Sequence, residues 1–222
     1  MLVYPISFMG GESEPTVTTF FRSYYSEANT TIYGVTTGED DTTVNRYIVT
    51  AFFGYSASGA NSMPTATIGG VSADVLINRP SGDSSAYYGM FGRHVPAGQN
   101  GDVIITFAST QTRCAAVSWQ IENVRTASAF DTVSAASSTS GNIDVAAGGS
   151  VIAFHGGTTI DNYSYTWTAP TEDLDSVAVA NVRSVSYSGA SADYEFADTN
   201  KAISCTPSGT NTNTIFMAVS MR

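Results

Sequence analysis

Apolar and polar residues alternate along most of this chain. A period of two places successive side chains on opposite faces of an extended strand, and no stretch keeps the 3.6-residue period of a helix. The sequence therefore predicts strands over residues 16–25, 46–55, 66–77, 85–95, 102–107 and 113–121 in the first half, and over 150–155, 163–168, 176–180, 183–188, 192–196, 202–205 and 214–221 in the second.

Clusters of Gly, Pro, Asn and Ser separate these ranges. The pair Gly69-Gly70 and the runs 80–83 and 96–101 contain the residues that tight turns need. Short strands that follow one another through such turns are typical of sandwiches. We therefore expect an all-β protein, an antiparallel β-sandwich of jelly-roll type with an N-terminal extension.

The two halves of the chain resemble each other. YIVTAFFG at 47–54 is similar in character to SVIAFHGG at 150–157, and each half closes on a strand of small and large apolar residues. We interpret residues 42–222 as one sandwich domain with an internal duplication, 46–125 and 150–222, in which each half supplies strands to both sheets. The low-complexity bridge 134–141 leaves open the alternative of two small sandwiches.

The N-terminal segment, residues 1–41, differs in composition from the rest of the chain. Prolines, a Gly-Gly pair and the acidic run 39–41 interrupt it, and four aromatic residues follow one another closely. Two interpretations stay open: an edge strand whose aromatics cap the core, or an arm that pairs with a neighbouring subunit by strand addition. The second makes these aromatics a candidate assembly contact: Phe20, Phe21, Tyr24 and Tyr25.

The charge of the chain excludes several partners. A formal net charge of -10 argues against nucleic acid, because affinity for phosphates depends on Lys and Arg, and Lys201 is the only lysine. No apolar run approaches the roughly 18 residues of a membrane-spanning helix, so no membrane partner is expected. Residues 1–15 have neither the basic region nor the apolar region of a secretory signal peptide. A Lys-poor, Ser/Thr-rich protein without such a signal suits a virion protein assembled in the host cytoplasm.

Side chains that could carry catalysis are few. The two histidines, His94 and His155, are expected near strand ends, and no serine lies in a GxSxG motif, so we expect no nucleophilic triad. Most carboxylates fall in predicted turns, and Glu195 should face water, away from its aromatic neighbours. No His/Cys cluster and no calcium-loop spacing is present. The sequence therefore predicts no enzyme, no cofactor and no metal site.

The two cysteines are far apart in the sequence. Cys114 and Cys205 each lie in a strand-like stretch without a CxxC neighbour. We expect two buried, unpaired thiols rather than a disulfide, because assembly in a reducing cytoplasm disfavours disulfides.

One segment offers a carbohydrate-binding alternative. Tyr163, Tyr165 and Trp167 alternate, so they should project from one face of a strand. If that face is exposed, the three rings form a platform for a glycan. If it faces the core, they are packing residues, which is the more usual place for large aromatics in a sandwich.

Several motifs of the chain combine a tight turn with a core strand. The turn at 68–73 (IGGVSA), the segment 95–107 (VPAGQNGDVIITF), a small-residue strand ending in Trp119 and the terminal 218–222 (AVSMR) are similar to β-sandwich proteins of tailed bacteriophages and gene transfer agents. The resemblance covers about residues 46–222 and consists of turns and core strands. It implies a capsid decoration protein, a head fibre or a tail component.

We therefore expect a non-enzymatic structural protein of a tailed phage. It would oligomerise with copies of itself and dock on other virion proteins of the capsid or tail. The alternative is a receptor- or carbohydrate-binding module of a tail fibre, with a host surface glycan as its partner.

Overall fold

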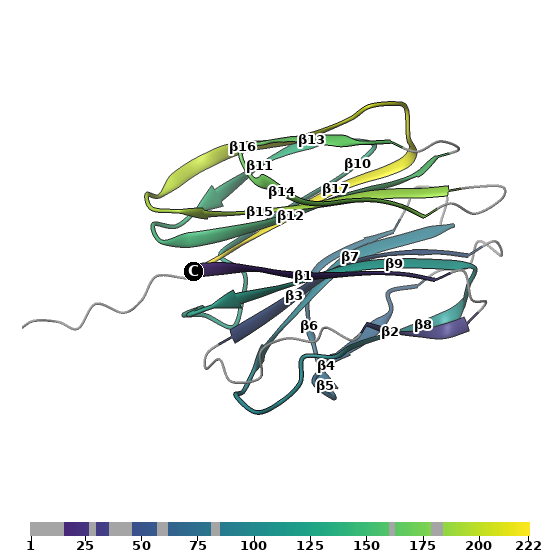
Figure 1. Ribbon diagram of the computed structural model, residues 1–222, viewed down its shortest axis with the longest axis horizontal. Helices are drawn as coiled ribbons and strands as arrows, with labels where there is room; N and C mark the ends of the chain where they lie inside the picture. The colour runs from purple at the N-terminus through teal and green to yellow at the C-terminus, as the bar shows by residue number, and fades with distance from the viewer. Residues whose placement is uncertain are drawn as a thin grey trace, which may run out of the picture.

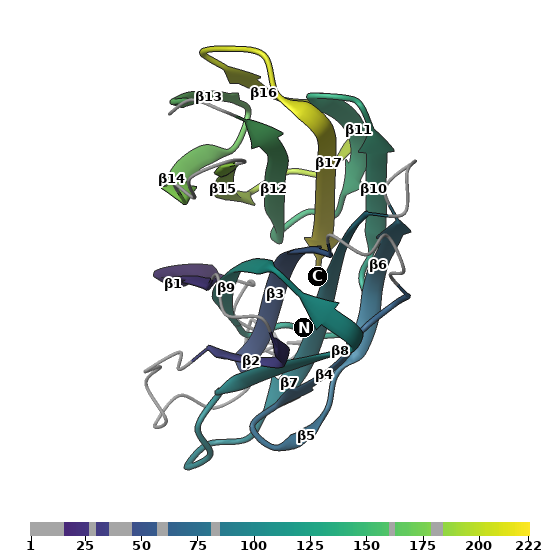
Figure 2. The ribbon, with the colours of Figure 1, turned by 90° about the vertical axis from the view of Figure 1, so that its right-hand side faces the viewer.

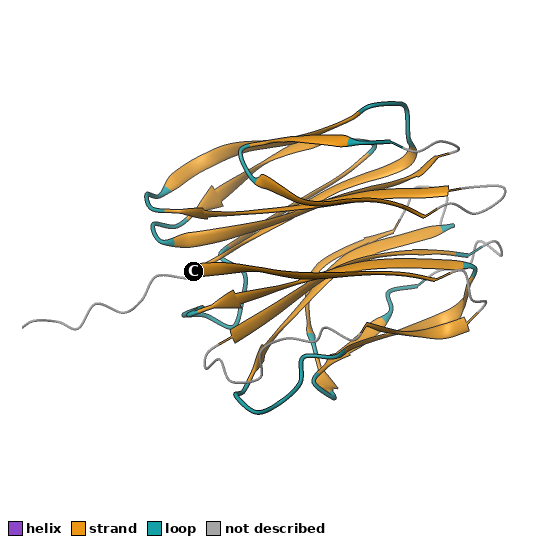
Figure 3. Ribbon diagram, viewed as in Figure 1, coloured by secondary structure: helices purple, strands orange, loops and turns teal. Residues whose placement is uncertain are grey.

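The protein is built from strands alone in the part of the chain that the structure describes. The computed structural model describes residues 16–26, 30–35, 46–56, 62–80, 85–159, 163–178 and 184–222, and of these only the backbone for 16–26, 159, 176–178 and 184–185. These residues contain no helix (Figure 3). The prediction of an all-β, sandwich-like fold is confirmed.

The first half of the chain forms two sheets. Sheet A has the order β1-β9-β3-β7-β6 and sheet B the order β2-β8-β4-β5, and every pairing is antiparallel. The bounds are β1 (Thr16–Ser26), β2 (Thr30–Val35), β3 (Arg46–Tyr55), β4 (Thr65–Ile68), β5 (Val71–Ser72), β6 (Asp74–Pro80), β7 (Ala86–Val95), β8 (Val103–Gln111) and β9 (Arg113–Glu122).

The second half forms two more antiparallel sheets. Sheet C has the order β10-β17-β12-β15-β14 and sheet D the order β11-β16-β13. The bounds are β10 (Asp131–Ala136), β11 (Ser140–Val145), β12 (Gly149–Thr159), β13 (Tyr165–Thr168), β14 (Thr171–Ala178), β15 (Ser184–Tyr194), β16 (Asp198–Pro207) and β17 (Thr212–Met221).

The two halves have the same topology. Reading along the chain, β1, β2, β3, β4, β6, β7, β8 and β9 take the places that β10 to β17 take in the second half, and β5 is an extra short strand. Each half therefore has the two interleaved Greek keys of a jelly roll. The duplicated unit is larger than the sequence indicated, because residues 16–122 correspond to residues 131–221.

Each half builds its own sandwich. No sheet among the described residues contains strands from both halves, so the expectation that each half contributes to both sheets was wrong. In each half the last strand pairs between the first and the third, β9 between β1 and β3 and β17 between β10 and β12, so each half completes its own sheet. The two sandwiches are nevertheless not independent, because they share a core.

The four sheets stack in the order B, A, C, D (Figure 1). One cluster fills the first sandwich between B and A, and a smaller one fills the second between C and D. The largest cluster lies between sheets A and C and includes Phe53, Trp119, Phe154 and Met217. Strands buried on both faces need continuous apolar runs, which explains the sequence RYIVTAFFGY of β3.

The packing of A on C is reciprocal. β9 contacts β15 and, in the equivalent pairing, β17 contacts β7; likewise β1 contacts β14 and β10 contacts β6. Figure 2 shows β1 and β14 on one side of the molecule and β6 and β10 on the other. The two jelly rolls therefore face each other as the subunits of a two-fold symmetric dimer do, within one chain.

Trp119 lies at this internal interface. Its side chain is only 1% exposed, and its indole N–H donates a 2.8 Å hydrogen bond to Asp173 Oδ2 across the two sheets. A Cβ at Gly189 would lie 2.5 Å from the Trp119 ring, so this ring occupies the space above the glycine. The Tyr88 hydroxyl donates to the carbonyl of Asn213, which adds a second polar link between the repeats.

Two stretches differ from the sequence-based expectation. The low-complexity bridge 134–141 is no linker: it contains the second half of β10, the turn at Ser137 and the start of β11. The N-terminal segment contains β1 and β2, which are edge strands of sheets A and B, so the first sandwich begins well before residue 42. By contrast, the turn at Gly69-Gly70 is as expected, and its φ values of 60° and 76° require glycine.

Candidate functional site

The outer edge of sheet A is the first candidate site. β1 pairs with β9 alone among the described strands, so its other side carries backbone groups that no described strand pairs. The register shifts between Thr18 and Phe21, and the ladder then runs without interruption from Phe21 opposite Trp119 to Ser26 opposite Cys114. A continuous, unpaired edge can accept another strand.

The four aromatic residues predicted as an assembly contact all belong to β1. Phe20 lies in the irregular part, while Tyr24 and Tyr25 lie opposite Ala116 and Ala115 of β9. Their side chains lie outside the described part of the structure. The structure therefore places these residues on an edge strand and leaves their role as a contact a prediction.

The predicted glycan-binding residues face inward. Tyr165 is buried, its hydroxyl donates to Ser186 Oγ, and it accepts a hydrogen bond from Asn211 Nδ2 at 3.0 Å. Trp167 packs against Phe216 and donates from its indole N–H to Ser188 Oγ at 2.7 Å. Two of the three rings therefore lie between sheets C and D and act as packing residues, the second of the two alternatives considered for this segment.

Tyr163 lies outside that core. It precedes β13, and its hydroxyl donates to the carbonyl of Thr210 at 3.2 Å. A Cβ at Gly209 would lie 2.1 Å from the Tyr163 ring, so the ring lies directly over the turn before β17. Its contacts are those of a residue that holds two loops together.

His155 is the most unusual polar residue of the fold. It lies in the middle of β12, not near a strand end as expected, and it is 0% exposed. Neither ring nitrogen has a hydrogen-bond partner among the described residues, and the ring packs beside Tyr165 with 5.4 Å between the ring centroids. Burial lowers the pKa of this histidine to about 4, so it is neutral at pH 7.

The position of His155 is equivalent to that of Phe52 in the first repeat. Tyr47 pairs with His94 across β3 and β7, and Ser150 pairs with Asp193 across β12 and β15 at the equivalent place. Five residues further on, Phe52 and His155 each face the interior of their own sandwich. One repeat has an aromatic stack there, with Phe52 and Phe91 at 5.2 Å, and the other has an unpaired imidazole.

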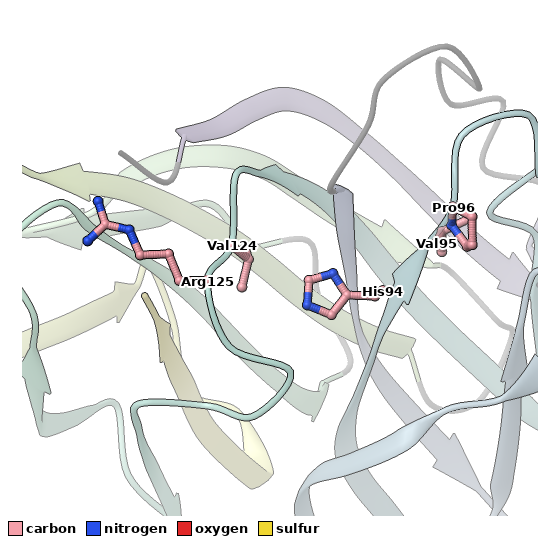
Figure 4. Close-up of a pocket in the computed structure, with 5 residues that line it drawn as sticks. All are labelled: His94, Val95, Pro96, Val124 and Arg125. Carbon is pink, nitrogen blue, oxygen red and sulfur yellow. The ribbon is translucent and has the colours of Figure 1, made fainter. Parts of the chain in front are cut away.

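His94 borders a surface pocket of about 460 Å³. The pocket lies where the end of β7 meets the segment between the repeats, and Figure 4 shows its five lining residues: His94, Val95, Pro96, Val124 and Arg125. The His94 ring makes an edge-to-face contact with Tyr47 at 4.9 Å. In Figure 4 the Arg125 side chain extends away from His94, so the two basic groups do not converge on one point.

Acidic side chains are grouped on β14, where burial and the charges of Asp175 and Asp173 raise the pKa of the Glu172 carboxyl. Glu195 is exposed, as expected. Asp173 is held by Trp119 and Ser191, and burial raises the pKa of its carboxyl despite these hydrogen bonds. Among the described residues, no three His, Cys, Asp or Glu side chains gather as a metal ion requires.

Both cysteines are buried and unpaired, as predicted. Burial raises the pKa of the Cys114 and Cys205 thiols, which disfavours the reactive thiolate.

The outer face of sheet B is a surface that sequence reasoning missed. Ile32 and Ile104 are exposed there, at 56% and 43%, and their cross-strand neighbours are Thr106, Gly34 and Thr67. The alternation of residues 103–108 could have indicated this surface. Ile104 lies at an exposed position of β8, where a polar residue is expected.

Comparison with known proteins gives no relative: no family model, no curated protein and no solved structure matches the chain. Within the described residues, no helix is long and apolar enough to span a membrane.

Proposed function

We propose that this chain is a non-enzymatic structural protein of a tailed-phage particle. It oligomerises through its N-terminal strand and docks on other virion proteins. The observation that carries the proposal is the open edge of β1 on a body of four packed sheets. An unpaired edge is a means of joining such a body to another polypeptide.

The motifs that resemble phage virion proteins support this proposal. The segment 68–73 forms the end of β4, a tight turn and β5, and the segment 95–107 forms the turn and most of the strand that follow β7. These positions define a sandwich and no reactive centre. Among the described residues, the polar groups of the interior are held in packing and hydrogen-bond contacts, apart from the neutral His155 and a few other unpaired atoms.

The test is the composition of the particle. The phage whose genome carries this gene is purified on a density gradient, and its proteins are identified by mass spectrometry, with antibody labelling in electron microscopy to place the chain on head or tail. We expect the chain in stoichiometric amounts on the particle surface. A particle that is complete without the chain contradicts the proposal. Binding of the free chain to a glycan array would instead support the receptor-binding alternative.

A further inference from the structure

The interior of the second sandwich is less apolar than that of the first. Among the described residues, the cluster between sheets C and D has seven buried apolar side chains and the cluster between sheets B and A has fourteen. Two of the three strands of sheet D are short, since β11 has six residues and β13 has four. The contact between sheets C and D is therefore the part of the stack that should open at the lowest cost in free energy.

His155 lies in this contact. Its cross-strand neighbours on sheet C are Ser188 of β15 and Phe216 of β17. The Ser188 hydroxyl accepts a hydrogen bond from the Trp167 indole N–H at 2.7 Å and donates one to the carbonyl of Leu174 at 2.9 Å. The polar side chain directly beside the imidazole is therefore bonded elsewhere, and both ring nitrogens of His155 lack a partner among the described residues.

A proton on His155 has no anion beside it among the described residues of the closed sandwich. The titratable side chains that line the interior around the ring are Tyr165 of β13, Cys205 of β16 and Asp175 of β14. Burial raises the pKa of the Tyr165 hydroxyl and of the Cys205 thiol, so both stay neutral in acid. Asp175 lies two strands away, at about 10 Å, because Ser188 is opposite both residues. Its Oδ2 accepts from the backbone N–H of Tyr165 at 2.8 Å, and Glu172 on the same strand is exposed.

We propose that the contact between sheets C and D is an acid-sensitive joint: in mild acid sheet D separates from sheet C, while the first sandwich and the contact between sheets A and C stay closed. The open form places His155 in water, where an imidazolium is solvated. Burial lowers the pKa of His155 to about 4 in the closed form, so acid shifts the equilibrium toward the open form between pH 6.5 and 4. This property goes beyond the particle role proposed above and does not depend on it.

The first sandwich shows why the effect is confined to the second. At the position equivalent to His155 it has Phe52, whose ring stacks on Phe91 at 5.2 Å and meets Phe107 edge to face at 5.9 Å between centroids. The other histidine of the chain, His94, is partly exposed at the end of β7. Acid therefore finds no buried imidazole between sheets B and A.

The two cysteines allow each sandwich to be followed separately. Cys114 belongs to the cluster between sheets B and A, Cys205 lies on β16 of sheet D, and both are 0% exposed. The full chain is treated with 4,4′-dithiodipyridine, which reacts with thiols in acid, and the modified cysteine is identified by peptide mass spectrometry. The protection of each thiol is its reaction rate in the urea-unfolded chain divided by that in the native chain at the same pH.

The wild type should lose protection at one thiol alone. Between pH 7.5 and 5.0 the protection of Cys205 should fall about 25-fold, which is the change in the opening equilibrium for a histidine whose pKa differs between about 4 and 6.5. Cys114 should react at least about tenfold more slowly than Cys205 at pH 5.0, because its sandwich stays closed.

Exchanging the equivalent residues gives a matched pair of variants. His155→Phe should keep Cys205 protected at pH 5.0, and Phe52→His should transfer the acid-dependent loss of protection to Cys114. A variant is compared only if both of its thiols are protected at pH 7.5, as in a folded chain. If His155→Phe fails this condition, His155→Leu takes its place.

Two results on the wild type alone would overturn the inference. Equal reaction rates of the two thiols at pH 5.0 would show that the chain opens as a whole. A change of less than about threefold in the protection of Cys205 would show that the closed sandwich accepts the proton. A loss of protection that persists in a folded His155 variant, or an unchanged Cys114 in a folded Phe52→His variant, would likewise contradict the role given to the buried imidazole.

Discussion

Replacement of His155 by phenylalanine should remove most of the acid sensitivity of the second jelly roll. The imidazole is fully buried and its two nitrogens lack partners, so the folded state resists protonation. Its pKa falls from 6.5 to about 4 on folding. At about 1.4 kcal/mol per pH unit, this difference corresponds to about 3 kcal/mol of unfolding free energy.

The direction follows from which state binds the proton. Because the folded pKa is lowered, the unfolded chain takes up a proton below pH 6.5 while the folded chain does so only near pH 4. The contribution of His155 to stability is therefore complete above pH 6.5, declines between pH 6.5 and 4, and is lost below pH 4. The raised pKa of the Asp173 carboxyl acts the other way, since its protonation on acidification favours the folded state.

The assay is urea unfolding followed by tryptophan fluorescence at pH 7.5, 6.5, 5.5 and 4.5. The two tryptophans report on different places, Trp119 on the interface between the repeats and Trp167 on the second sandwich. The variant His155→Phe introduces the residue type that the first sandwich has at the equivalent position, Phe52. The readout is the slope of unfolding free energy against pH. A loss of stability from imperfect packing of the new ring is the same at every pH and leaves this slope unchanged. His94→Phe, at a partly exposed position, is the control for loss of a histidine.

The wild type should lose more stability than His155→Phe between pH 6.5 and 4.5, by about 2 kcal/mol. Equal slopes for the two proteins would refute the reasoning. That result would mean that the imidazole finds a partner for its proton within the folded sandwich.

Three further predictions concern packing and reactivity. Gly189→Ala should lower the free energy of unfolding in urea by about 1–3 kcal/mol, because the added Cβ would meet the buried ring of Trp119. At Gly98 an added Cβ would meet nothing, so Gly98→Ala should cost about 1 kcal/mol from its positive φ alone. Equal costs for the two variants would contradict the close contact at Gly189. Trp119→Phe should lower stability by about 2 kcal/mol through loss of the indole hydrogen bond and of ring contacts. Asp173→Ala, which removes the acceptor, is the partner variant for a double-mutant cycle, and an additive cycle would show that the bond contributes nothing. The native chain should react with no equivalents of a thiol reagent such as DTNB and the urea-unfolded chain with two, because both thiols are buried; rapid reaction of the native chain would show that one of them is accessible.

Alternation predicted the fold class because successive side chains of a strand point to opposite faces, whichever strands it pairs with. It placed β3, β7 and β9 to within a residue or two, since these strands are long and strongly apolar. It missed β10 and β11, where Ser, Thr and Ala have no clear period and pairing with β17 and β16 decides the conformation. Register and layer order come from contacts distant in the sequence, which no local pattern encodes.

For the candidate sites, too, local patterns predicted some features and contacts distant in the sequence decided the others. Alternation put Tyr165 and Trp167 on one face, but only the position of sheet D shows that this face is interior. His155 looked like a strand-end residue because two glycines follow it, yet those glycines continue β12 as far as Thr159. The comparison with Phe52 was available in the sequence as the match between 47–54 and 150–157, and its meaning appeared once both strands were seen to face their own cores.

The fusion of two jelly rolls in one chain has a consequence for growth of an assembly. Two identical, separate subunits would each present the same free edge, and a pair of them joined face to face could add further pairs at both ends without limit. Here the copies have diverged: β1 (Thr16–Ser26) and its counterpart β10 (Asp131–Ala136) are both edge strands, but they differ in length and in sequence. The two outer edges of such a building block are therefore not equivalent, and a partner that recognises one of them has no matching site at the other.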